Sequence, residues 1–149
     1  MDRKSFITKC GKGCLGLMFS SFLLESCSGT RYVSGNIDNE YLVLDANSFV
    51  RKESDGSNGK KFYRYLIVEN KALQFPIVVF KNDTENYTAL LMQCTHQGAE
   101  LQVYGDRLQC PAHGSEFNSK GIVTNGPAMS PLKSFFVEVQ NQSLKIKLS

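Results

Sequence analysis

The chain has 149 residues, enough for one domain of ordinary size and too few for separate cofactor-binding and substrate-binding domains. It is 42% hydrophobic and 21% charged, with a net charge of +3, which is typical of a folded globular protein rather than a disordered one. Because this charge is small, nucleic acid is not an expected partner.

The N-terminal segment has the profile of an export signal. Residues 2–12 are basic, and an apolar run follows over residues 13–24. Spanning a bilayer as a helix takes about 20 apolar residues, so this shorter run favours a signal peptide over residues 1–26, with a permanent anchor as the second interpretation. The basic start, Arg3-Lys4-Ser5-Phe6-Ile7-Thr8-Lys9, resembles a twin-arginine export signal with Lys4 in place of the second arginine.

The end of this segment predicts attachment to a membrane. Leu24-Glu25-Ser26-Cys27 resembles a bacterial lipoprotein processing site, which makes Cys27 the candidate lipidation site. We therefore expect an exported protein, attached by its N-terminal lipid or anchor to the periplasmic side of a bacterial membrane. Small polar residues follow Cys27 and predict a tether over residues 27–35, with the folded domain over residues 36–149.

From residue 41 onward, short β-rich runs alternate with turn residues such as Asn141-Gln142, and no run shows sustained helical periodicity. In the last run, Leu144, Ile146 and Leu148 alternate with Lys145 and Lys147, as in a strand with one face in water. The pattern predicts an all-β fold, a small barrel or sandwich. The expected strands are residues 41–44, 62–68, 75–80, 87–92, 101–104, 135–139 and 144–148.

Metal-binding and redox-active residues are concentrated in one window of the body. Cys94 and His96 follow one expected strand, and Cys110 and His113 follow the next, so two loops can converge on one centre. The Cys-x-His spacing is too tight for the usual zinc knuckles, although a structural zinc site or a Cys94–Cys110 disulfide remains an alternative. Mixed Cys and His ligation suits a 2Fe-2S cluster in which two histidines replace two cysteines on one iron.

At these residues the sequence resembles the Rieske iron–sulfur family, whose signature is a Cys-x-His box followed by a Cys-x-x-His box. The resemblance extends to Gly98, to Gly114-Ser115 and to residues 121–132, which look like the proline-containing loop that packs over the cluster. It implies an antiparallel barrel or sandwich with a cluster-binding subdomain of two loops, and one 2Fe-2S cluster as cofactor. Carried over residue by residue, it implies these roles: Cys94 and Cys110 on the inner iron, His96 and His113 on the outer iron, and Ser115 as donor to a bridging sulfide.

Four positions depart from the quinol-oxidising members of that family. Phe117 stands where those members have a tyrosine hydroxyl near a cysteine sulfur, and Ala99 and Ala112 stand where they have a bridging pair of cysteines. Gln97 replaces an apolar residue that shields the cluster. With one hydrogen-bond donor missing and a wetter edge, we expect a reduction potential below that of the quinol-oxidising members.

These features predict a one-electron carrier that passes electrons between redox partner proteins and is not itself an enzyme. The chain offers no additional histidine for a general acid or base. The alternative function is a Rieske subunit of a membrane oxidoreductase, either a cytochrome bc-type complex or a molybdenum oxidase. The ferredoxin component of a dioxygenase is a weaker alternative, because the export segment argues against a cytosolic protein.

Overall fold

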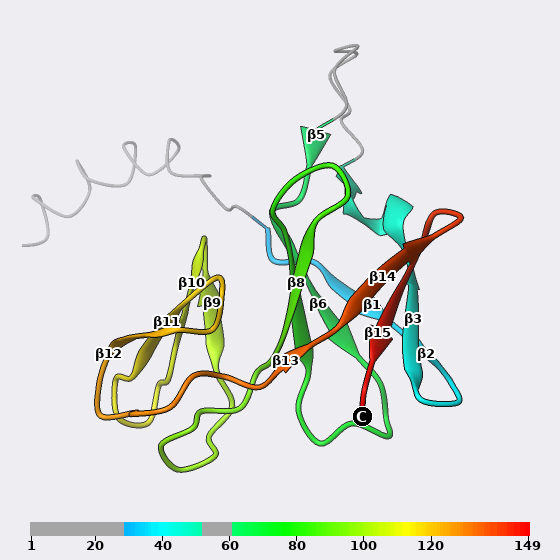
Figure 1. Ribbon diagram of the computed structural model, residues 1–149. Helices are drawn as coiled ribbons and strands as arrows, with labels where there is room; N and C mark the ends of the chain where they lie inside the picture. The colour runs from blue at the N-terminus through cyan, green and yellow to red at the C-terminus, as the bar shows by residue number, and fades with distance from the viewer. Residues whose placement is uncertain (1–28, 52–60) are drawn as a thin grey trace, which may run out of the picture.

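The computed structural model describes residues 29–51 and 61–149, and in this part of the chain the fold is almost entirely β (Figure 1). The all-β expectation is confirmed, since strands are joined by turns and the one helical element there is a short 3-10 helix, η1 (Ala46–Phe49). The strands are β1 (Tyr32–Ser34), β2 (Asn36–Asp38), β3 (Tyr41–Asp45), β4 (Val50–Arg51), β5 (Lys61–Phe62), β6 (Tyr65–Glu69), β7 (Ile77–Lys81), β8 (Tyr87–Leu91), β9 (Gln102–Tyr104), β10 (Arg107–Gln109), β11 (Glu116–Asn118), β12 (Val123–Asn125), β13 (Ser134–Phe135), β14 (Val137–Gln140) and β15 (Ser143–Lys147).

Three sheets organise these strands. A five-stranded sheet has the order β1-β6-β7-β8-β13, and a four-stranded sheet has the order β14-β15-β3-β2. A second four-stranded sheet, β12-β11-β10-β9, stands to one side in Figure 1 and carries the segments rich in cysteine and histidine. A short β4–β5 pair completes the described part of the chain.

The central strands have a core on each face, which explains their continuous apolar sequence. In β7, Ile77 and Val79 belong to a core shared with β3 and β15, whereas Val78 and Phe80 belong to a core shared with the cysteine loops. All four residues are at most 3% exposed. A strand covered on both faces reads as an unbroken hydrophobic run rather than an alternating one. The second core therefore fixes the cysteine loops against a rigid sheet.

The sheet begins earlier than the sequence suggests. Part of the expected tether, Tyr32–Ser34, pairs in parallel with β6, and Gly35 donates its N–H to the carbonyl of Glu69 at 3.1 Å. A Cβ on Gly35 would lie 2.7 Å from the Leu42 side chain, so the chain packs tightly there. Residues 32–35 thus belong to the folded domain. The first strand is short and has no alternating apolar pattern, so backbone pairing with β6 is what stabilises it.

Two expected strands are each divided in the structure. Residues 135–139 contribute to β13, which pairs with β8, and to β14, which pairs with β15, so the chain passes between sheets at Phe136. Residues 62–68 likewise contribute to β5 and β6. The turn at Asn141 and Gln142 is as expected, with φ angles of 48° and 66°, which suit a two-residue hairpin turn.

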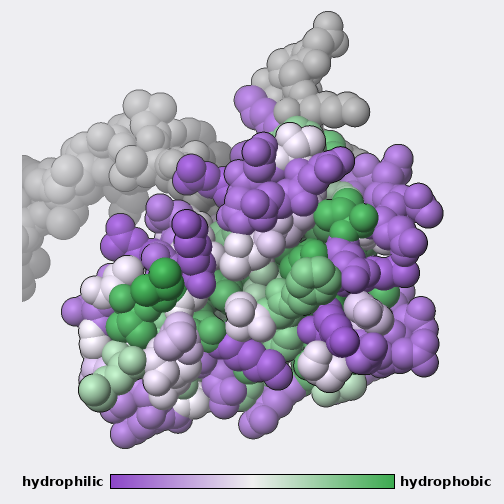
Figure 2. Space-filling model, in the orientation of Figure 1, coloured by the Kyte–Doolittle hydropathy of each residue, from purple (hydrophilic) through white to green (hydrophobic). Residues whose placement is uncertain are grey.

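Hydrophilic residues cover most of the face shown in Figure 2, with hydrophobic residues in separate patches. Within the described residues, no helix has the length and apolar character needed to cross a bilayer. The expected signal segment and Cys27 lie outside the described residues.

Candidate metal centre

The first candidate loop follows β8 and closes on itself through two backbone hydrogen bonds. The N–H of Cys94 donates to the carbonyl of Ala99 at 2.8 Å, and the N–H of Gly98 donates to the carbonyl of Cys94 at 2.8 Å. Gly98 has φ of 76°, the left-handed conformation that a side chain disfavours. This glycine therefore allows the chain to return tightly around Cys94.

The second loop follows β10 and repeats the same closure. The N–H of Cys110 donates to the carbonyl of Ser115 at 2.8 Å, and the N–H of Gly114 donates to the carbonyl of Cys110 at 3.0 Å. Gly114 has φ of 78°, matching the glycine of the first loop. Each loop thus presents one cysteine and one histidine, and the two loops are closed by the same pattern of backbone hydrogen bonds.

The two cysteines lie inside and the two histidines lie outside. Cys94 and Cys110 are 2% and 1% exposed, belong to the same core cluster and are free thiols rather than a disulfide. His96 and His113 are exposed, and their ring centroids lie 5.0 Å apart with the rings perpendicular. The structure therefore places the two thiols together in the core and the two imidazoles together at the surface.

The environment of Cys110 favours its thiolate form. Burial acts to raise the pKa of this thiol, but the backbone N–H groups of His113 and Ala112 and the thiol of Cys94 donate to its sulfur, and the net pKa is lowered. The thiolate is the form of cysteine that ligates metals. The loop is therefore built to hold a negatively charged sulfur.

Ser115 is fully buried beside Cys110 and has one hydrogen bond already formed. Its Oγ accepts a hydrogen bond from the backbone N–H of Ala128 at 3.0 Å. A serine hydroxyl can accept and donate at once. The proton of this hydroxyl is therefore available for a second acceptor at the centre, as the resemblance to the Rieske family implies.

The segment of residues 125–132, which we call the strap, contacts both loops. The Thr95 hydroxyl of the first loop donates to the carbonyl of Ser130 at 2.7 Å, and the Asn125 amide donates to the carbonyl of Gly114 in the second loop at 3.2 Å. Ala128 and Leu132 are buried, and the Gly126–Pro127 peptide is cis. The strap thus packs over the loops as expected. Sequence reasoning missed Thr95 and Asn125, because polar loop residues carry no pattern that reveals a partner 35 or 11 residues away.

The donor set fits a two-iron cluster better than a single metal ion. Among the described residues, no three Cys, His, Asp or Glu side chains converge in a way that could hold one ion. A structural zinc site needs four ligands around a single point. A Rieske cluster needs only two protein ligands on each iron, and the buried thiol pair and exposed imidazole pair match that division.

The positions that depart from the quinol-oxidising pattern are ordinary in packing. Phe117 is fully buried in the core cluster that contains both cysteines, and Ala99 packs against this cluster. Ala112 and Gln97 are exposed. The aromatic ring at residue 117 therefore contributes contact area without a hydroxyl group.

Comparisons with known proteins agree with this geometry. The profile of the Rieske 2Fe-2S domain matches residues 47–136. The cytochrome b6-f complex iron-sulfur subunit 2 of Trichormus variabilis is 32% identical over 72 residues, which cover 47% of this chain and 40% of that protein. The corresponding subunit of Chlorobaculum tepidum is 27% identical over 74 residues, covering 48% and 41%. The match thus spans about two fifths of these relatives' own length.

Solved structures share the fold. The cyanobacterial plasma membrane Rieske protein PetC3 from Synechocystis PCC 6803 superposes with a TM-score of 0.50 at 25% identity, covering 56% of this chain and 86% of that chain. A structure of the oxygenase and ferredoxin complex of carbazole 1,9a-dioxygenase gives 0.52 at 24% identity, covering 74% and 95%.

The two-loop site on an all-β frame defines an iron–sulfur protein of the Rieske type. The chain belongs to the Rieske 2Fe-2S domain family, and the cofactor of this domain is one 2Fe-2S cluster.

Proposed function

We propose that this protein is a one-electron carrier in which Cys94 and Cys110 hold the inner iron and His96 and His113 hold the outer iron. The observation that carries the proposal is the buried thiol pair behind an exposed imidazole pair. Ser115 completes the site as a donor toward a sulfide. The carrier is not itself an enzyme, because both histidines of the chain are assigned to the cluster and neither is left to act as a general acid or base.

The bound cluster supplies reversible one-electron chemistry at about −150 to +300 mV, against about −400 mV for plant-type ferredoxins. The chain's own residues set where in this range it operates. Neutral imidazoles in place of two thiolates leave the oxidised centre without net charge, so accepting an electron costs less. The Ser115 hydroxyl stabilises the reduced state, in which the sulfurs carry more negative charge.

The surface around the histidines suits contact with a partner protein. The segments 94–99, 110–115 and 125–132 contain no Asp, Glu, Lys or Arg, although 21% of the chain is charged. Met129 of the strap is 95% exposed. Lys133 is exposed and lines the same hollow as Thr95 and His96, so a partner that approaches the imidazole edges meets this lysine and otherwise mainly neutral groups.

We also propose that the protein is exported and held on the periplasmic side of a bacterial membrane through Cys27. The basic start, the short apolar run and the cysteine at residue 27 support this proposal. Mass spectrometry of the native N-terminus tests it. A diacylated or triacylated Cys27 is the expected result, and an uncleaved N-terminus would favour the retained anchor instead.

Elemental analysis and electron paramagnetic resonance test the electron-carrier proposal. The full-length protein should contain iron and inorganic sulfide in equal amounts, and its reduced form should give a signal with an average g value below 2. His96→Ala and His113→Ala should abolish this signal, whereas the matched control Gln97→Ala, on the same loop, should keep it. Protein loaded with iron but lacking sulfide would refute the proposal.

A second candidate is a Rieske subunit of a membrane oxidoreductase complex. The named cytochrome b6-f subunits among the relatives favour this function. Two features weigh against a quinol-oxidising version. Ala99 and Ala112 cannot form the loop disulfide of the quinol-oxidising members, and Phe117 lacks the hydroxyl of their tyrosine. A resonance signal that shifts when a quinone-site inhibitor is added to native membranes would favour the complex over the free carrier. The ferredoxin of a dioxygenase is a third candidate, supported by likeness of fold alone.

A further inference from the structure

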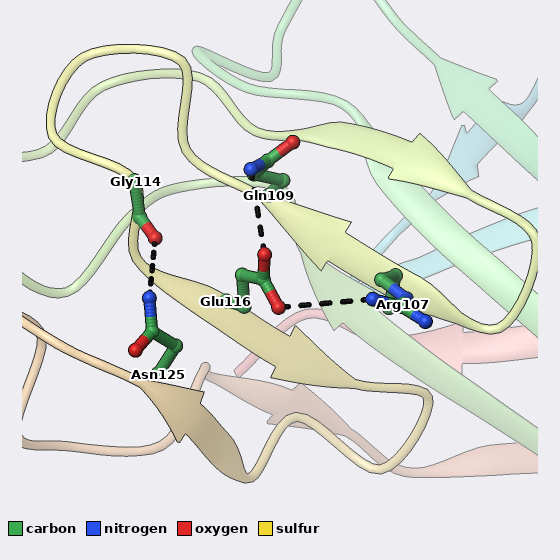
Figure 3. A network of polar contacts seen from close by, with 5 residues as sticks. All are labelled: Arg107, Gln109, Gly114, Glu116 and Asn125. Carbon is green, nitrogen blue, oxygen red and sulfur yellow. Dashed lines mark hydrogen bonds and ion pairs between the residues drawn. The ribbon is translucent and has the colours of Figure 1, made fainter.

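The side chain of Asn125 is bonded to the loop that carries His113. Its amide nitrogen donates to the carbonyl of Gly114, the residue directly after His113, at 3.2 Å (Figure 3). In that loop Pro111, Ala112 and His113 are all exposed, so core packing does little to hold them. Bonds at the ends of the loop must therefore fix its orientation.

A β-bulge aims Asn125 at this carbonyl. In the β11–β12 pair, Glu116 opposes Asn125 and Phe117 opposes Val123, so Thr124 is an extra residue in β12. Bulges of this kind bend a strand and redirect its side chains, and they occur often beside functional sites. The Asn125 amide points along the pair toward Gly114 rather than directly outward (Figure 3).

The carboxylate of Glu116, the residue that opposes Asn125 in the β11–β12 pair, has its contacts with β10. The carboxylate of Glu116 lies 3.9 Å from Arg107 and accepts a hydrogen bond from Gln109 at 3.4 Å. Figure 3 shows these contacts on the β10 side of Glu116, opposite to Asn125. The Asn125 amide is therefore left to bond the Gly114 carbonyl.

Gly114 is consequently tied through both of its backbone polar groups. Its N–H donates to the carbonyl of Cys110, and its carbonyl accepts from Asn125. The loop has no disulfide to hold it, because both described cysteines are free and residue 112 is alanine. Two side-chain bonds to the strap therefore restrain the exit of this loop: Asn125 holds the Gly114 carbonyl, and the Ser115 hydroxyl accepts from the N–H of Ala128.

We propose that Asn125 is a positioning residue for His113. By holding Gly114, it sets the direction in which the second loop presents its imidazole to the outer iron. This inference rests on the proposed function, because it assigns His113 to that iron.

The test uses the cluster-loaded, full-length protein and compares variants that lose the Asn125 amide donor with a variant that keeps an amide. Asn125→Leu removes the amide at similar volume, Asn125→Ala removes it without adding bulk, and Asn125→Gln keeps an amide on a longer side chain. Asn86→Leu is the matched control, because Asn86 is exposed on the turn between β7 and β8, outside the cysteine loops and the strap.

Two measurements report on the cluster itself. We expect Asn125→Leu and Asn125→Ala to broaden the resonance lines of the reduced cluster and to lose visible absorbance about fivefold faster, the factor expected for one ordinary hydrogen bond. Asn125→Gln should lie between these variants and the wild type, and Asn86→Leu should match the wild type. A purely structural role would lower the denaturation midpoint without altering the resonance line shape.

Two outcomes would overturn the inference, and they are distinguishable. If the wild type holds the cluster and both Asn125→Leu and Asn125→Ala give its unaltered spectrum and rate of cluster loss, the inference alone is wrong. If the wild type contains no inorganic sulfide, the proposed function fails and the inference fails with it. If Asn125→Leu does not fold, Asn125→Ala decides the question.

Discussion

Two residues close to the cysteines, Ser115 and Phe117, set the polarity around the proposed cluster. Both are fully buried, and they lie on the same segment two residues apart. Ser115 offers a hydroxyl proton, whereas Phe117 offers none. We therefore expect loss of the Ser115 hydroxyl to lower the reduction potential and a hydroxyl added at residue 117 to raise it.

Ser115→Ala should lower the reduction potential. Without the hydroxyl, the extra negative charge of the reduced state loses a donor, and a charge-assisted bond of about 1.5–3 kcal/mol corresponds to about 60–130 mV for one electron. The substitution also leaves the N–H of Ala128 without its partner, which should cost about 1–3 kcal/mol of stability. Protein-film voltammetry and denaturant unfolding measure the two effects. An unchanged potential would contradict the role of Ser115 as a donor toward the cluster.

Phe117→Tyr should raise the potential. We expect the wild-type midpoint to lie below that of the quinol-oxidising members, and a hydroxyl at residue 117 would supply the donor that the resemblance identifies as missing. One added hydrogen bond worth about 1.4 kcal/mol more in the reduced state corresponds to about 60 mV. Voltammetry of both proteins checks the prediction. A wild-type midpoint near the top of the family range, or a variant that only loses stability, would count against it.

At the scale of elements, the site depends on loops whose backbone enters the left-handed region. Gly98 and Gly114 close the two cysteine loops, and Gly121 begins the path into the strap, with its carbonyl accepting the N–H of Leu132 at 2.9 Å. These positions combine a positive φ with a hydrogen bond that fixes the next segment. Side chains there would strain the backbone, so the elements around the site tolerate little change.

Gly121→Ala should destabilise the protein more than Gly105→Ala. Both glycines have a positive φ, 79° and 65°, so both substitutions strain the backbone by about 1–2 kcal/mol. At Gly121 the new Cβ would also lie 2.9 Å from Leu90 and 3.3 Å from Leu132, whereas at Gly105 nothing lies within 4 Å. Overpacking adds about 1–3 kcal/mol at Gly121. Equal losses in urea unfolding would show that the contact with Leu90 is relieved without cost.

At the scale of the whole molecule, few charges lie beside the proposed redox site. The Arg107–Glu116 ion pair joins β10 and β11, and the Lys147–Glu40 pair joins β15 to the turn before β3. The three segments around the histidines are uncharged, and Lys133 lines the hollow beside His96. Long-range steering of a partner depends on charge near the contact and weakens with salt. The arrangement favours contacts that depend on apolar and neutral polar groups.

With Lys133 as the charged side chain beside His96, electron exchange at this surface should depend only weakly on ionic strength. With a small anionic oxidant and a small cationic oxidant, we expect rate constants to change by less than about twofold as the Debye length falls from about 30 Å to about 8 Å. Stopped-flow mixing measures these rates. Gln97→Lys is the control that adds a second positive charge beside His96, and it should make the two oxidants respond to salt in opposite directions. A strong dependence in the wild type would mean that distant charges dominate.

Many of the strands and turns could be predicted from the local sequence pattern. The alternation of Leu144, Ile146 and Leu148 predicted a strand with one buried face, and Asn141-Gln142 predicted the turn before it. The switch at Phe136 was not predictable, because one continuous β-rich run gives no sign that its two halves pair with different sheets. The strand Tyr32–Ser34 escaped notice for a similar reason, since its pairing partner β6 lies over thirty residues away.

By itself, the sequence determined the kind of chemistry, because the pairing of one cysteine with one histidine in each of two glycine-containing boxes is a local property of the chain. Only the tertiary structure decided how these boxes face each other, which thiols are buried and which imidazoles are exposed. It also revealed that Thr95 and Asn125 bond the loops to the strap. Such contacts form between segments distant along the chain, and their geometry exists only once the sheets have packed.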